Sequence, residues 1–198
     1  MPITDKNDGL HRVVLVVALL NLAYFGVEFV VALRIGSVSL FADSVDFLED
    51  ASVNVLIMLA LTWSLKARSQ VGMVLAGILL VPALALLWAL WSKFSHPVPP
   101  EPFALSITGG GALLVNLSCA FMLARFRSHS GSLTRAAFLS ARNDAVANVA
   151  IIAIGLVTAF VWRSVWPDVV VGLAIAAMNI DAAREVWTAA REEHKALV

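Results

Sequence analysis

Four carboxylates stand within eight residues of an otherwise apolar stretch, FADSVDFLEDASVN (residues 41–54). They are Asp43, Asp46, Glu49 and Asp50. At about 100° per residue, an α-helix places all four side chains on one face, within an arc of about 120° around the helix axis. Asp46 and Asp50 are one turn apart on that face. Four like charges on one face repel, so we expect some of them to be protonated or a cation to lie among them. Oxygen-only clusters of this kind suit hard or borderline divalent cations.

A fifth carboxylate, Asp144, lies in a second apolar segment, with Ser140 and Asn148 one turn before and after it on the same helical face. If both segments cross a bilayer, Asp144 and the paired aspartates all lie near its midplane, where they could meet. Asn21 and Glu28 lie in a third apolar segment. Either of them could be a packing or gating group or a part of the same site.

The composition places these charges in a membrane. The chain has 198 residues, of which 60% are hydrophobic and only 14% are charged, and its mean hydropathy is +0.87. A soluble domain has about 25% charged residues. Lys and Arg balance Asp and Glu, so the net charge says nothing about partners, and no basic patch of the kind that binds nucleic acid appears. The single cysteine, Cys119, excludes a disulfide framework or a cysteine metal cluster.

The elements that must position the acidic residues are transmembrane helices, which need about 20 mainly apolar residues each. Lys and Arg are concentrated in the loops on the side of the N-terminus, which predicts that both termini are cytoplasmic. Residues 191–198 would form a short cytoplasmic tail. The sequence thus predicts an all-α membrane protein with one domain over residues 1–190, built from six spans at about 13–33, 38–65, 71–92, 103–124, 134–162 and 166–188.

The run GSVSLFADSVDFLED (36–50) resembles the signature of the cation diffusion facilitator (cation efflux) family, in which a Ser-x-Ser-Leu-x-Ala-Asp lead-in precedes a pair of metal ligands four residues apart. NLAYFGVE (21–28) and NDAVANVAII (143–152) resemble the first-span and fifth-span segments of the family. Asp168 lies where the family often has an acidic residue. The resemblance covers essentially the whole membrane portion, and the second-span motif is its most specific part.

The resemblance implies a six-helix bundle that exports divalent metal ions, of the Zn, Co, Cd or Mn class, in exchange for protons. It also implies a homodimer, and we expect it in the inner (plasma) membrane of a bacterium. The metal is cargo, and we expect no enzymatic activity. Carried over by position, the resemblance assigns the metal ligands to Asp46, Asp50, Ser140 and Asp144. The accompanying proton-relay or supporting positions are Asp43, Glu49, Asn148, Asn21 and Glu28.

Two departures from the family pattern leave alternatives open. Ser140 stands where the family usually has His or Asp, so the fourth ligand could instead be water, Asn148, Asp43 or Glu49. After the predicted sixth span only AREEHKALV remains, so we expect a short member without the cytoplasmic metal-binding domain that many members carry there. A metal-binding regulatory or sensor protein with impaired transport is therefore the alternative function. A membrane aspartyl hydrolase, and acids that serve only interhelical hydrogen bonds, are weaker alternatives.

Overall fold

The structure is a computed structural model that describes residues 3–60, 86–124 and 131–178, together with positions 64, 70, 74 and 84. For residues 3–8, 57, 60 and 131–143 it describes the backbone alone. Every regular element within these ranges is a helix. The elements are α1 (Ile3–Ile35), α2 (Val38–Ala60), a helix over residues 86–95, α4 (Pro102–Ala124), α5 (Gly131–Phe160) and a helix over Trp166–Met178.

The helices differ in length from the apolar segments of the sequence. α1 begins at Ile3, well before the apolar residues that start at position 13, because backbone hydrogen bonds can continue a helix into polar residues. α5 ends at Phe160, two residues before the predicted end of the span. Pro167 follows in the first turn of the next helix, where its fixed φ angle is compatible with helix. Most of the predicted third span, and the predicted sixth span beyond residue 178, lie outside the described residues.

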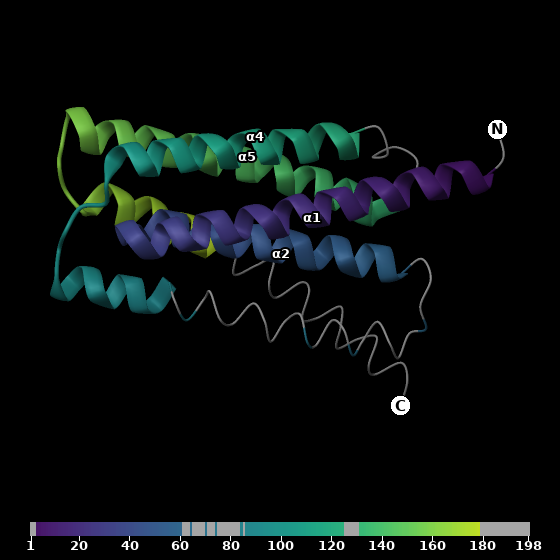
Figure 1. Ribbon diagram of the computed structural model, residues 1–198, viewed down its shortest axis with the longest axis horizontal. Coiled ribbons are helices and arrows are strands. Elements are labelled where there is room, and N and C mark those ends of the chain that lie inside the picture. Colours follow the sequence, from purple (N-terminus) through teal and green to yellow (C-terminus); the bar gives the residue numbers. More distant parts are fainter. Residues whose placement is uncertain are drawn as a thin grey trace.

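The four long helices form one antiparallel bundle (Figure 1). α1 packs along α2, α4 packs along α5, and further contacts join α1 to α4 and α2 to α5. α1 and α5 run in one direction and α2 and α4 in the other, so the α1–α2 turn and the start of α4 lie at the same end of the bundle, opposite the N-terminus (Figure 1). The bundle thereby places α2 beside α5, the two helices that carry Asp46, Asp50 and Asp144.

A glycine in α4 lets α1 approach closely. A methyl group at Gly111 would overlap the hydroxyl group of Tyr24 on α1. That hydroxyl donates a hydrogen bond of 2.7 Å to the carbonyl oxygen of Thr108. The neighbouring Gly110 has no atom within 4 Å of the position that a Cβ would take, so only one of the two glycines is required by packing.

The turn between α1 and α2 is built from local caps. Gly36 adopts a φ of +63°, a conformation that glycine takes at little cost after a helix end. The Ser37 amide then donates to the carbonyl oxygen of Ala32 at 3.2 Å, as in a Schellman motif. Ser37 also accepts a hydrogen bond from the Leu40 amide at 3.2 Å, which makes it the N-cap of α2.

Candidate metal centre

The centre of the bundle holds an acidic cluster shared by α2 and α5. Asp144 on α5 lies within hydrogen-bonding reach of Asp50 on α2, and Asp43 and Glu49 are close enough to act on it electrostatically. Asp46, Asp50 and Asp144 are half-buried, whereas Asp43 and Glu49 are buried. Carboxylates from two helices therefore converge inside the bundle, where the low dielectric makes their mutual repulsion costly.

α1 contributes a further carboxylate to the cluster. Glu28 is fully buried, the Asp43 carboxyl group lies within hydrogen-bonding reach of it, and the Asp46 carboxyl group lies within electrostatic range. Both carboxyl oxygens of Glu28, and Oδ1 of Asp43, are buried and receive no hydrogen bond from any of the described residues. Buried polar oxygens normally have a partner. These three oxygens are therefore available to a proton, a water molecule or a cation.

A chain of side-chain amides orients Asp43. Nδ2 of Asn148 on α5 donates to Oδ2 of Asp43 at 2.6 Å, and Nδ2 of Asn116 on α4 donates to Oδ1 of Asn148 at 2.9 Å. All three side chains are almost completely buried. The amide group of Asn148 therefore donates its hydrogen bond to the acidic cluster. Through its two hydrogen bonds it joins α5 to α2 and to α4.

The predicted residues are brought together unequally. Ser140 lies in α5 one turn before Asp144, but its side chain is outside the described part of the structure. Asn21 is fully buried on α1, where its Oδ1 lies 3.8 Å from Sγ of Cys119 on α4. Cys119 is in turn within electrostatic range of Asp50 and Asp144. Among the described residues, no three His, Cys, Asp or Glu side chains converge closely enough to hold a metal ion. The four-ligand set remains a prediction.

Two polar positions were missed by the sequence analysis. Asn116 is the single side-chain amide within the apolar segment of α4. A lone amide in an apolar helix indicates a buried polar partner on a neighbouring helix, and this was the signal in the sequence. The family pattern places an acidic residue at Asp168 but predicts no role for it. In the structure it is fully buried and accepts hydrogen bonds from the first residues of α2. The adjacent signal was Ser-Val-Ser at residues 37–39, which is typical of a helix start.

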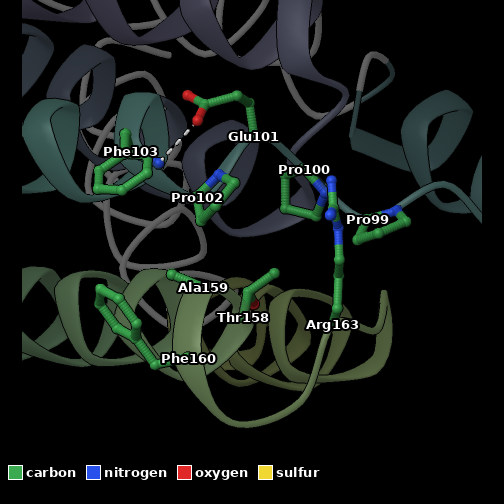
Figure 2. A pocket seen from close by; sticks show the side chains of 9 residues that line it. All are labelled: Pro99, Pro100, Glu101, Pro102, Phe103, Thr158, Ala159, Phe160 and Arg163. Carbon is green, nitrogen blue, oxygen red and sulfur yellow. Dashed lines mark hydrogen bonds between the residues drawn. The ribbon is translucent and has the colours of Figure 1, made fainter.

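A separate pocket of about 480 Å³ lies between the start of α4 and the end of α5 (Figure 2). Glu101 caps α4 there by accepting hydrogen bonds from the amides of Phe103, at 3.1 Å, and Ala104. Arg163 extends across the opening toward Pro99 and Pro100 (Figure 2). Thr158 in its wall is 14 residues from Asp144, about 21 Å along α5. The pocket is therefore distinct from the acidic cluster.

The described helices and the sequence comparison agree on the class of protein. Gly9–Ile35 and Pro102–Ala124 are long and apolar enough to cross a membrane. The sequence matches the cation efflux transmembrane domain over residues 14–192, and the chain belongs to the cation efflux (cation diffusion facilitator) family. No curated protein matches it. The chain is thus an integral membrane protein of a family of cation efflux transporters, and the predicted all-α transmembrane bundle is confirmed.

Proposed function

We propose that this chain exports a divalent metal cation from the cytoplasm in exchange for protons. Asp46, Asp50 and Asp144 are the carboxylate ligands, and Ser140 occupies the fourth position. The observation that carries the proposal is the approach of Asp50 on α2 to Asp144 on α5 inside the bundle. A cation shared by the two helices would offset the repulsion between them.

Proton coupling follows from the chemistry of the ligands. The same carboxylates bind either metal or protons, so metal arriving from the cytoplasm displaces protons, and protons arriving from outside displace metal. Asp43, Glu49 and Glu28 extend the cluster toward α1 and supply further proton acceptors. Asn148 and Asn21 are neutral side chains that can form hydrogen bonds next to these proton acceptors.

The oxygen-rich ligand set favours hard or borderline ions, so the cargo belongs to the Zn, Co, Cd or Mn class. The hydroxyl group of Ser140 is a weaker ligand than the His or Asp common in the family. This substitution motivates a second candidate function, a metal sensor or regulator that binds its ion without turnover. Metal binding without flux across the whole metal panel would favour that second function.

We place the protein in a bacterial inner membrane with both termini in the cytoplasm, as the Lys and Arg distribution predicts. We further propose that it is a homodimer, on family resemblance alone. Cross-linking in native membranes, together with accessibility of a tag at each terminus, tests both statements.

The functional test is metal flux into proteoliposomes loaded with a metal-sensitive dye, for Zn²⁺, Co²⁺, Cd²⁺ and Mn²⁺ in turn. We expect the wild type to transport at least one of the four and Asp50→Asn to lose that flux. Glu101→Gln is the matched control, because it makes the same carboxylate-to-amide change at the α4 cap, away from the cluster. Equal metal-driven proton flux in the wild type and Asp50→Asn would refute the assignment.

A further inference from the structure

The outer end of α2 is held by a residue from the far end of the described chain. The Asp168 carboxylate accepts hydrogen bonds from Ser37 Oγ at 2.7 Å and from Ser39 Oγ at 2.6 Å. It also accepts from the backbone amides of Val38, at 2.8 Å, and Ser39, at 3.1 Å. Ser37, Ser39 and Asp168 are all fully buried.

These contacts make Asp168 a second N-terminal cap for α2. The first amides of a helix have no partner within the helix, and the helix dipole favours negative charge at that end. Ser37 satisfies the Leu40 amide from within the turn, and Asp168 satisfies the two amides before it. Because hydrogen bonds to a carboxylate are stronger than neutral ones, this cap ties α2 firmly to helix Trp166–Met178.

The same two helices touch again one turn further on. A methyl group at Gly172 would lie 2.7 Å from the carbonyl carbon of Val38 and 2.8 Å from the Ser39 amide nitrogen. Asp168 and Gly172 are four residues apart, so they share one face of their helix. The first turn of α2 therefore rests directly on the backbone of helix Trp166–Met178.

A buried lysine supports the charge of this contact. Lys93, at the end of helix 86–95, is 8% exposed. Its ammonium group donates a hydrogen bond to the carbonyl oxygen of Val98 and lies near Gly36 in the α1–α2 turn. Asp168 is within electrostatic range of it. Its positive charge therefore partly compensates the buried carboxylate.

We propose that Asp168 is a positioning residue that joins the outer half of α2 to helix Trp166–Met178 as one rigid unit. Asp46 is eight residues after Val38, about 12 Å along the helix, so this unit carries the first predicted ligand with it. The two helices then move together when the transport site changes sides. This inference rests on the proposed function, since it assigns a role within the transport cycle.

The first experiment compares Asp168→Asn and Asp168→Ala with the wild type in detergent. The probes are titrations of Zn²⁺, Co²⁺, Cd²⁺ and Mn²⁺. We expect both variants to weaken metal binding, and alanine to raise the metal Kd more than asparagine, because alanine removes every hydrogen bond that Asp168 accepts. Glu101→Gln is the matched control, because it alters a carboxylate cap of α4 but touches nothing on α2, and its metal Kd should be that of the wild type. An unchanged Kd in both Asp168 variants would overturn the positioning role.

The second experiment replaces the hydrogen bonds with a covalent tie. Ser37→Cys and Asp168→Cys are combined in a Cys119→Ala background and joined by a short thiol cross-linker that reducing agents remove. We expect the free thiols to bind metal weakly and the cross-linked protein to recover both binding and flux. This recovery separates positioning from a general loss of stability. Cross-linked protein that binds metal but transports it only after reduction would overturn the rigid unit.

A third measurement keeps the inference testable if the wild type transports none of the four metals. Hydrogen–deuterium exchange of the amides of residues 38–42 needs no metal. We expect faster exchange there in Asp168→Asn and unchanged exchange in Glu101→Gln. Absence of flux in the wild type would refute the proposed function. Unchanged exchange in Asp168→Asn would refute the proposal that Asp168 holds the first turn of α2 in place.

Discussion

At the scale of single residues, the amide of Asn148 determines which oxygen of Asp43 remains available. It donates to Oδ2 and is itself held by Asn116, so Oδ1 is left pointing away from the amide chain. The Oδ1 atom and the Glu28 carboxyl oxygens make no hydrogen bond within the described ranges. The amide chain thus leaves Oδ1 of Asp43, next to the buried Glu28 carboxyl group, as the oxygen open to a proton or a cation.

Asn148→Leu keeps the branching of the side chain, with a somewhat larger volume, but removes both amide contacts. We expect a loss of about 1–3 kcal/mol in stability, because Asp43 and Asn116 are then buried with an unsatisfied group each. Thermal unfolding in detergent measures the change. Ser118→Ala is the control, since Ser118 is exposed and bonds only within its own helix. Equal stability of Asn148→Leu and the wild type would contradict the account.

The single cysteine tests the packing between α1 and α4. Cys119 is fully buried against Asn21, so we expect a membrane-permeant maleimide to label it only after unfolding. In a Cys119→Ala background, Ser118→Cys places a thiol one residue away on the exposed side of the same helix, and in detergent solution we expect it to be labelled faster than Cys119. Similar labelling rates at the two positions would contradict the packing.

At the scale of elements, α1, α2, α4 and α5 are held together by close approaches as well as by polar contacts. Gly111 allows Tyr24 to reach the backbone of α4, and Gly172 allows helix Trp166–Met178 to rest on α2. Small residues at such crossings are typical of membrane bundles, where helices associate by packing rather than by the hydrophobic effect.

The adjacent glycines of α4 offer a matched pair of substitutions. Gly111→Ala drives a methyl group into the Tyr24 hydroxyl, and we expect it to destabilise the bundle by about 1–3 kcal/mol. Gly110→Ala meets open space and should be neutral or stabilising by up to about 1 kcal/mol, since alanine favours helix. Comparing the two unfolding temperatures in one detergent checks this. The reverse order would show that the α1–α4 crossing is wrongly described.

At the scale of the whole molecule, the carboxylate cluster predicts how metal binding depends on pH. Protons and metal compete for the same oxygens, so metal affinity should fall as the pH falls. Asp50→Asn removes one titrating ligand and should flatten this dependence as well as weaken binding. Isothermal titrations across a pH series measure both effects. A metal affinity that is independent of pH would contradict proton coupling through these groups.

The sequence predicted the membrane class, the helical fold and the family, because hydropathy, charge placement and the 36–50 motif are local signals. The metal site of Asp46, Asp50 and Asp144 stays a prediction, although the structure does bring Asp50 on α2 close to Asp144 on α5. The sequence could not predict that Asp168 caps α2, or that Asn116 joins Asn148 and Asp43. Those contacts depend on which helices become neighbours, and one sequence does not specify that choice.

The central claim is that Asp46, Asp50 and Asp144 bind the transported ion. Anomalous scattering from crystals of the protein soaked in Zn²⁺ or Mn²⁺ tests it most directly. We expect one strong peak between α2 and α5, with carboxylate oxygens of all three residues at about 2.0–2.2 Å from the metal. A metal peak elsewhere in the molecule, with these three carboxylates uncoordinated, would contradict the account.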